Sequence, residues 1–206
     1  MTFTDSTSTS TSPSTDRRDD LVVLVGNPRP RSRTRTAAEA VARRLADRAG
    51  LRGTPRTIDL ADLAGQLLLA EAPDVDAALR TVAAAPFAVV ATPVYKASYT
   101  GLLKAFLDRY GPRGLAGVTA VPLVVSASPD HSRAGDDHLR PLLVELGARV
   151  PDSSLALLET QLPDVDVVAD AWLDAWSDAW PPGAAWPDAS LPEVPLPVAG
   201  VPEAVR

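Results

Sequence analysis

A run of hydroxyl and arginine side chains follows the first apolar stretch of the chain. The segment GNPRPRSRTRT, Gly26 to Thr36, stands between LVVLV and a helical pattern. The unpaired N–H groups and macrodipole of a helix start attract anions, and hydroxyl and guanidinium groups add donors suited to a phosphate. The segment has neither the Gly-Lys-Ser/Thr of a Walker loop nor the glycine triplet of a dinucleotide fingerprint. It indicates a phosphate site, and the alternative is a solvated turn in which Ser32 or Thr34 caps the helix.

A second polar stretch, ATPVYKASYTG, begins at Ala91 and continues another apolar run. Pro93 stiffens the backbone there, and Tyr95 supplies an amphipathic ring whose neighbouring backbone groups suit the polar edge of a planar ligand. This pattern predicts a loop that holds a flat aromatic cofactor. In the alternative interpretation, Tyr95 and Tyr99 only pack, and Ser98 caps the next helix.

A third stretch, SASPDHSRAGDDH, spans Ser126 to His138 and contains serine, aspartate and histidine together. No G-x-S-x-G elbow surrounds Ser126 or Ser128, and His131 lies too near in sequence for the usual triad, whose members come from separate elements. Two histidines and two aspartates on a polar segment are also a weak metal signal. We expect a hydrogen-bonded surface loop beside a ligand.

The elements that position these loops alternate between strands and helices. Strands are predicted at Leu21–Val25, Arg56–Leu60, Phe87–Ala91, Thr119–Ser126 and Ser153–Leu158, and helices at Thr34–Gly50, Asp74–Ala84, Ser98–Tyr110, Asp136–Gly147 and Asp166–Trp180. The strand segments are short apolar runs, and the helices repeat apolar residues every three or four positions. Pro122 is awkward for a central strand, and Pro141 must lie in the first turn of its helix or kink it.

This alternation predicts an α/β protein with a parallel sheet covered on both sides. The fold class is a flavodoxin-like three-layer sandwich with a five-stranded parallel sheet in the order 2-1-3-4-5. Ligands of such sheets bind beyond the carboxyl ends of the strands, near the point where strand order reverses between strands 1 and 3. The three polar loops should therefore meet at one edge.

Composition sets outer limits on function. The 206 residues are 46% hydrophobic and 22% charged, which suits one globular domain. A net charge of −6 argues against a broad nucleic-acid face, and the absence of cysteine excludes thiol chemistry. No apolar run approaches the roughly 18–20 residues of a membrane span, and we expect a cytoplasmic protein. We predict a disordered arm at 1–20, a flavodoxin-like domain at 21–180 and a proline-rich extended tail at 181–206.

Taken together, the motifs resemble those of the NAD(P)H-dependent FMN reductases. GNPRPRSRT after the first strand, ATPVYKASYTGLLKAFLD after the third, and LRPLLVELGA in the fourth helix carry the resemblance, which covers Leu21 to about Thr160. The nearest branch is similar to the flavin reductases that serve two-component alkanesulfonate monooxygenases.

The resemblance implies a role for each matching position. The residues around the FMN phosphate would be Asn27, Arg29, Ser32, Arg33 and Thr34. Those along the isoalloxazine ring and ribityl chain would be Pro93, Val94, Tyr95 and Lys96. Ala127 and Ser128 would touch the other edge of the ring, although relatives often have a glycine pair where SAS stands here. Tyr99 and the helix after it would help form a homodimer or homotetramer.

The chemistry that the resemblance implies is hydride transfer from NADPH or NADH to FMN. This reaction requires no general acid or nucleophile from the protein, because the cofactor carries it. Reduced flavin would then pass to a partner such as a flavin-dependent monooxygenase. The open alternatives are a quinone or azo-dye reductase that keeps FMN bound and a flavodoxin-type electron carrier without nicotinamide activity. A non-enzymatic interaction module using Trp172, Trp176 and Trp180 is a further alternative, against which packing of these rings is favoured.

Overall fold

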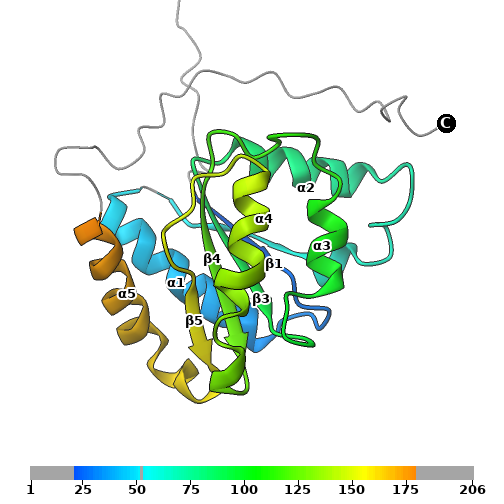
Figure 1. Cartoon of the computed structure of the whole chain (residues 1–206). Coiled ribbons are helices and arrows are strands. Elements are labelled where there is room, and N and C mark those ends of the chain that lie inside the picture. The colour runs from blue at the N-terminus through cyan, green and yellow to red at the C-terminus, as the bar shows by residue number, and fades with distance from the viewer. Residues whose placement is uncertain (1–20, 52, 180–206) are drawn as a thin grey trace, which may run out of the picture.

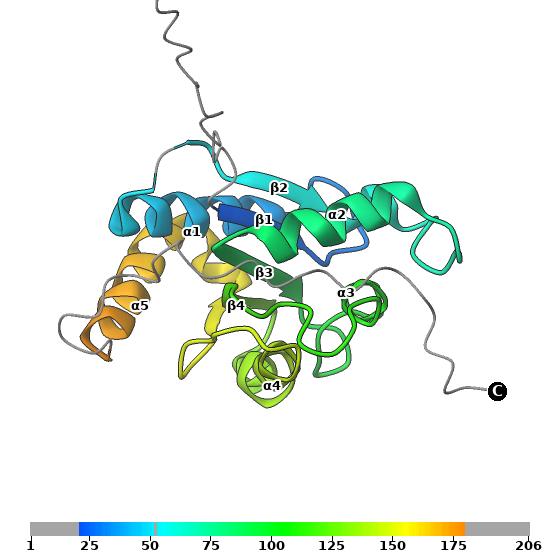
Figure 2. The same cartoon turned by 90° about the horizontal axis from the view of Figure 1, so that it is seen from above.

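The computed structural model describes residues 21–51 and 53–179. The expected arm at 1–20, the expected tail at 181–206 and Trp180 lie outside the described residues. The five strands form one parallel sheet in the order β2-β1-β3-β4-β5, with helices on both faces (Figures 1 and 2). The strands are β1 (Leu21–Val25), β2 (Arg56–Asp59), β3 (Phe87–Pro93), β4 (Thr119–Ser126) and β5 (Leu155–Leu158). The predicted flavodoxin-like sandwich and its strand order are confirmed.

Each strand connects to the next through helical segments. The α-helices are α1 (Arg33–Ala49), α2 (Pro73–Ala84), α3 (Gly101–Leu107), α4 (Arg140–Glu145) and α5 (Val165–Ala179). Shorter segments are η1 (Leu60–Leu63), η2 (Pro129–His131), η3 (Gly135–Leu139) and η4 (Glu159–Asp164). Helices α1 and α5 cover one face of the sheet, and α2, α3 and α4 cover the other.

The central strand β1 shows why its sequence is continuously apolar. Val22 and Leu24 enter the core beneath α2, α3 and α4, whereas Leu21, Val23 and Val25 enter the core beneath α1 and α5. All five side chains are at most 3% exposed. Because successive side chains of a strand point to opposite faces, a strand with helices on both faces needs apolar residues at every position.

Helix α1 begins and ends close to the predicted positions. The Ser32 side chain accepts a hydrogen bond from the Arg35 N–H, and Gly50 ends the helix with φ 65°. A hydroxyl at the N-cap satisfies one orphan N–H, and the left-handed region after the last turn is where glycine is favoured. The start of α1, which faces the predicted site, is therefore well defined.

The start of the third helix was predicted wrongly. Helix α3 begins at Gly101 and not at Ser98, because Thr100 is the N-cap and accepts a hydrogen bond from the Leu103 N–H. Tyr95 and Ser98 instead pair with each other in a tight antiparallel turn. The alternative in which Ser98 caps the helix is thereby also wrong.

The predicted single helix Asp136–Gly147 is divided into a π-helical turn, η3, and α4. Pro141 lies in the first turn of α4, where a missing N–H is tolerated. At the other end, Asp136 accepts hydrogen bonds from the backbone N–H and hydroxyl of Ser154, at 2.6 and 2.7 Å. This contact fixes the start of η3 against the residue that precedes β5.

Pro122 is accommodated in β4 because of where the neighbouring strand begins. It lies opposite Val90 of β3, while pairing with β5 starts one residue later, at Leu123. Two residues earlier, on the same side of the strand, the Ala120 N–H donates toward the β5 side, to the Arg149 carbonyl. The missing N–H of Pro122 therefore faces a side on which β5 has not yet begun, and no ladder bond is lost.

The two tryptophans of α5 that the structure describes pack as expected. Trp176 is 8% exposed, and both Trp172 and Trp176 contact the core beneath α1 and α5, with ring centroids 5.4 Å apart. In residues 21–51 and 53–179, no helix has the length and apolar character that a membrane crossing requires, and no cluster of three acidic or histidine side chains could hold a metal ion.

Candidate functional site

The three polar loops leave neighbouring strands at the same edge of the sheet. Strand β3 lies between β1 and β4, and all three run parallel, so the chain after Val25, Pro93 and Ser126 emerges at the carboxyl edge, at the bottom of Figure 1. This is the point where strand order reverses, the usual ligand position in open parallel sheets.

The first loop is organised by two buried polar side chains. The Asn27 side chain donates a hydrogen bond to the Thr34 hydroxyl oxygen at 3.0 Å and accepts one from the Arg29 N–H at 2.9 Å. Asn27 is 7% and Thr34 is 2% exposed. In these contacts the oxygens of Thr34 and of the capping Ser32 act as acceptors, so neither contact uses a hydroxyl proton. The loop thus presents hydroxyls and the N–H groups of a 17-residue helix at one place.

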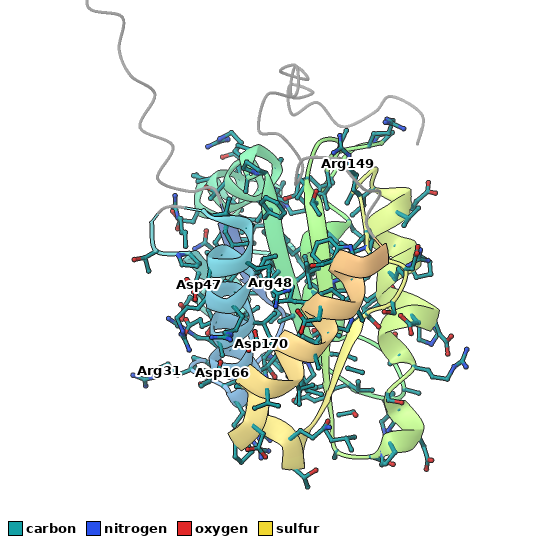
Figure 3. The ribbon with its side chains drawn as sticks, turned by 90° about the vertical axis from the view of Figure 1, so that its left-hand side faces the viewer. Arg31, Asp47, Arg48, Arg149, Asp166 and Asp170 are labelled. Atoms are coloured by element: carbon teal, nitrogen blue, oxygen red, sulfur yellow. The ribbon has the colours of Figure 1, made fainter. Side chains whose placement is uncertain are left out.

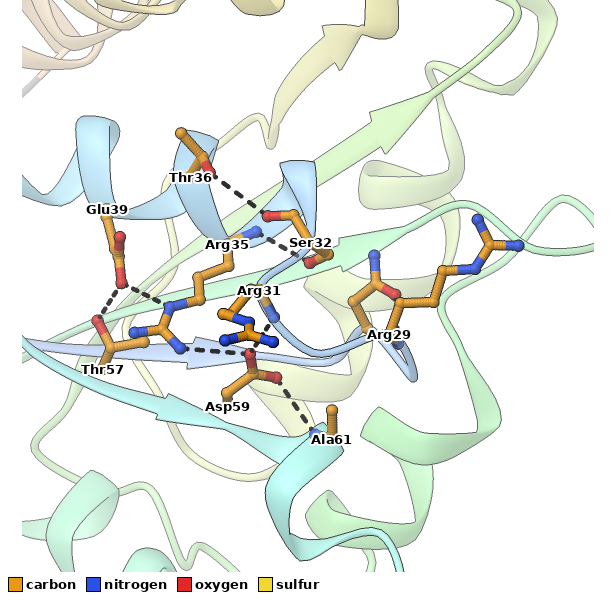
Figure 4. Close-up of polar contacts among 10 residues, drawn as sticks. Arg29, Arg31, Ser32, Arg35, Thr36, Glu39, Thr57, Asp59 and Ala61 are labelled. Atoms are coloured by element: carbon orange, nitrogen blue, oxygen red, sulfur yellow. Dashed lines mark hydrogen bonds and ion pairs between the residues drawn. The ribbon is translucent and has the colours of Figure 1, made fainter.

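The arginines of this loop differ in what they contact. Arg35 turns toward β2, where it donates to Glu39 at 2.8 Å and lies 3.6 Å from Asp59 (Figure 4). The hydrogen bond to Glu39 is the main cause that raises the pKa of the Arg35 guanidinium. Arg33 pairs with Glu159 at 2.9 Å, and Arg29 is exposed. Arg35 is therefore a structural residue of the turn, whereas Arg29 and Arg33 extend into solvent.

Asp59, at the end of β2, was not predicted to take part in this region. Its carboxylate accepts hydrogen bonds from the N–H groups of Arg31, at 3.3 Å, and Ala61, at 3.2 Å (Figure 4). Arg31 has φ 52°, a left-handed conformation that is uncommon for a residue with a side chain. An acidic residue at the carboxyl end of a strand beside the switch point is the sequence signal that could have indicated Asp59.

The second loop is tied directly to the first through Thr100. Its hydroxyl donates to the Gly26 carbonyl, and its N–H donates to the Thr92 hydroxyl at 3.2 Å. A Cβ added to Gly26 would lie 2.6 Å from the Leu103 Cβ, so a side chain there would displace α3. The loop predicted to bind the flavin phosphate and the loop predicted to bind the flavin ring are thus joined by a hydrogen bond between Gly26 and Thr100.

Within the second loop, residues Tyr95 to Ser98 form a two-residue hairpin turn. The Tyr95 N–H donates to the Ser98 carbonyl at 2.8 Å, and the reverse bond measures 3.1 Å. Lys96 and Ala97, between them, have φ values of 52° and 62°. Positive φ at both central positions is the type I′ pattern that normally selects Asn-Gly. Strained backbone of this kind is concentrated at ligand-binding sites.

The third loop is joined to the second by a bond from the Val94 N–H to the Val125 carbonyl, 2.9 Å long. Ser126 donates to the Ser128 carbonyl, and the Ser128 hydroxyl accepts from the Asp130 N–H. Both serines are thus engaged with the backbone of their own loop, and the described residues form no Ser–His pair there. The triad interpretation has no geometric support, and Ala127 is exposed at the loop's tip.

The structure thus brings together the segments that contain all the residues predicted to bind FMN. Those residues are Asn27, Arg29, Ser32, Arg33, Thr34, Pro93, Val94, Tyr95, Lys96, Ala127 and Ser128. Their individual contacts with a flavin stay predictions.

Comparison with known proteins identifies the family. The sequence profile described as NADPH-dependent FMN reductase matches residues 20–161, which include β1 to β5. The chain belongs to the NADPH-dependent FMN reductase family. The resemblance read from the loop motifs is thereby confirmed.

Members and neighbours of this family resemble the chain to different extents. The crystal structure of the NADH:FMN oxidoreductase EMOB in its apo form is 34% identical and superposes with a TM-score of 0.67, covering 79% of this chain and 90% of that one. The NADH-dependent FMN reductase SfnE of Pseudomonas putida is 31% identical over 133 residues, 62% of this chain and 70% of that protein. The FMN reductase (NADPH) of Escherichia coli K12 is 44% identical over 61 residues, 30% of this chain. The chain spans about a third, 32%, of the length of that relative in the match.

Proposed function

We propose that this protein reduces FMN with a hydride from NADPH or NADH. The observation that carries the proposal is the meeting of the phosphate-type turn and the Pro-Val-Tyr-Lys loop at the switch point of a family-matched sheet. FMN, when bound, supplies the ring atom that accepts the hydride. The chain itself contributes binding and orientation.

The residues of the first loop suit a flavin phosphate. Ser32 and Thr34 keep hydroxyl protons for donation, Arg33 and Arg29 supply cations, and the start of α1 supplies free N–H groups with a favourable dipole. The Asn27 side-chain amide orients Thr34 by donating a hydrogen bond to its hydroxyl oxygen. These donors match a dianionic group, and their attraction for it should weaken as salt concentration rises.

The second and third loops suit the ring. The rigid turn after Val94 places Tyr95 and Lys96 outside the sheet edge, with Tyr95 44% exposed. Pro93 and Val94 lie half-buried beneath that turn, while Ala127 and Ser128 stand at the end of the adjacent strand. We expect the ring to lie between these two loops, with one face open to nicotinamide.

Purified protein mixed with FMN tests this function most directly. Flavin fluorescence should be quenched on binding, and adding NADPH or NADH should give a loss of nicotinamide absorbance that depends on FMN. Comparison of the two nucleotides assigns the preferred donor. Absence of both quenching and nicotinamide oxidation would contradict the proposal.

Replacing Ser32 and Arg33 together with alanine tests the phosphate assignment. The double variant should bind FMN about tenfold or more weakly, because two donors to a charged group are lost, and riboflavin about as well as the original protein. Titration of each flavin by fluorescence measures the difference. Arg48→Ala with Ser177→Ala removes the same side-chain types at the far end of α1 and from α5, and should leave both affinities unchanged. Equal losses for FMN and riboflavin would argue against the phosphate site.

A finer proposal concerns the fate of the flavin. From the resemblance to reductases that serve monooxygenases, we propose that reduced FMN leaves for a flavin-dependent monooxygenase. Filtration after reduction should then remove flavin from the protein. Yellow colour retained on the protein after reoxidation would favour the quinone or azo reductase, and flavin binding without nicotinamide oxidation would favour the flavodoxin-type carrier. Sedimentation would test the proposed homodimer or homotetramer.

A further inference from the structure

The guanidinium expected to bind the flavin phosphate already has an anionic partner. Arg33 is the first residue of α1, and its Nη2 lies 2.9 Å from a carboxylate oxygen of Glu159. Glu159 is the first residue after β5, in a part of the sequence far from the phosphate turn. The side chains are 69% and 41% exposed, so the pair can open toward solvent or a ligand.

Glu159 is held at this edge by its neighbours. The last pairing of β5 joins Leu158 to Ser126, at the base of the third loop. The Leu158 N–H then donates to the Gln161 side chain at 2.9 Å, which fixes the turn that presents Glu159. Because this turn is already ordered, forming the ion pair between Glu159 and Arg33 costs little backbone entropy.

The other paired arginine of the turn is also neutralised by the protein. Arg35 contacts both Glu39 and Asp59 (Figure 4). The two arginines of α1 nearest its start are therefore balanced by three carboxylates, from α1 itself, the end of β2 and the residue after β5. A phosphate that binds Arg33 must therefore compete with Glu159 for the guanidinium and is repelled by the negative charge of that carboxylate.

We propose that Glu159 is a specificity-determining residue that competes with the flavin phosphate for Arg33. The inference rests on the proposed FMN reductase function. Competition at the phosphate weakens FMN selectively and leaves the ring's own contacts unchanged. Its consequence is an FMN that is released more readily than it would be without Glu159.

A purely structural role makes a different prediction. Helix α1 forms further ion pairs with α5, Arg44 with Asp170 and Arg48 with Asp174, along the contact seen in Figure 3. If the Arg33–Glu159 pair only continues this series, its loss changes stability and not ligand affinity. Asp174→Asn is therefore the matched control, since it breaks a pair of α1 at the opposite end from the flavin loops.

Glu159→Gln is the test variant, because glutamine keeps the size and removes the charge. The dissociation constant for FMN, measured by fluorescence quenching, should fall about two- to fivefold, the effect of one exposed ion pair. Riboflavin affinity should not change, and Asp174→Asn should change neither. The gain should shrink as salt concentration rises. Unchanged or weaker FMN binding, or an equal gain for riboflavin, would overturn the inference.

A double-mutant cycle separates competition for Arg33 from a general charge effect. Arg33→Ala alone should weaken FMN binding, and Glu159→Gln added to it should bring back little affinity. A full two- to fivefold gain in the Arg33→Ala background would show that Glu159 acts without Arg33, which overturns the competition. If the unaltered protein binds neither flavin, the proposed function itself fails. If it binds FMN and Glu159→Gln has no effect, only this inference fails.

Discussion

Asp59 shows how one buried carboxylate shapes the turn after β1, which we propose binds the flavin phosphate. It is 5% exposed and pairs in register with Val25, the last residue of β1. Its two oxygens receive the N–H groups of Arg31 and Ala61 and lie near the guanidinium of Arg35. Because a buried charge is tolerated only with such partners, these donors and Asp59 fix one another. The left-handed conformation of Arg31 is held by this arrangement.

We expect Asp59→Asn to disturb the turn and with it the phosphate site. An amide cannot accept at both positions, so the Arg31 N–H or the Ala61 N–H loses its partner, and the free energy of unfolding should fall by about 1–3 kcal/mol. FMN affinity should fall more than riboflavin affinity. Denaturant unfolding and flavin titration measure the two effects. Asp62→Asn removes an exposed charge from the same η1 segment and serves as the control. Unaltered FMN binding in Asp59→Asn would show that the turn keeps its shape without this carboxylate.

At the scale of elements, the Tyr95–Ser98 turn is strained in a way that its sequence does not suggest. Lys96 and Ala97 both have positive φ without being glycine or asparagine. Each left-handed residue with a Cβ is disfavoured by about 1–2 kcal/mol. The isolated bridge between Tyr95 and Ser98 and the cap at Thr100 keep the backbone in this conformation.

Ala97→Gly should therefore stabilise the protein. Removing the Cβ at φ 62° relieves strain, and the free energy of unfolding should rise by about 0.5–1 kcal/mol after allowance for the greater freedom of glycine in the unfolded chain. Chemical denaturation measures the change. Ala64→Gly, an exposed position with φ −54°, should instead lower stability. A loss of stability in both variants would mean that the turn carries no such strain.

Local patterns predicted the elements well where spacing alone determines them. Ala37, Val41 and Leu45 are buried as expected from their four-residue spacing, and Gly50 ends α1. The start of α3 was predicted wrongly, because the turn before it has positive φ at Lys96 and Ala97 and contains no glycine that would indicate a turn. It also could not find Asp59 and Glu159 as partners of the phosphate turn. Those contacts arise between segments distant in sequence, which only the register of the sheet brings together.

At the scale of the whole molecule, the helical segments on each face of the sheet are joined to one another by different polar contacts. On one face, Arg44 of α1 binds Asp170 of α5, and this hydrogen bond is the main cause that lowers the pKa of Asp170. On the other face, the Tyr110 hydroxyl donates to the Leu79 carbonyl of α2 at 3.0 Å, and burial raises the pKa of Tyr110. The contribution of Asp170 to stability is complete above the ordinary pKa of an aspartate and is lost as the pH falls below it. Acid and alkali therefore weaken contacts on opposite faces of the sheet.

Stability should decline above about pH 10 because of Tyr110. The phenol stays protonated in the folded state while the unfolded chain ionises near its ordinary pKa of 10.0, so the contribution is complete below that pH and is lost above it. Tyr110→Phe should unfold about 1 kcal/mol more easily at neutral pH, since the Leu79 carbonyl loses its donor, and should show a shallower alkaline decline. Denaturant midpoints between neutral and strongly alkaline pH measure both. Parallel curves for the two proteins would assign the alkaline loss to other groups.

The close approach of Gly26 to Leu103 also constrains how this sequence can change over time. With only 2.6 Å between a Cβ at position 26 and the Leu103 Cβ, any residue other than glycine at position 26 requires α3 to move, because shortening Leu103 to alanine would leave the clashing Cβ in place. Position 26 should therefore stay glycine among descendants of this chain for as long as α3 keeps its place. A side chain at position 26 would shift the helix that follows the second loop, so a change in the first loop would alter the position of the second.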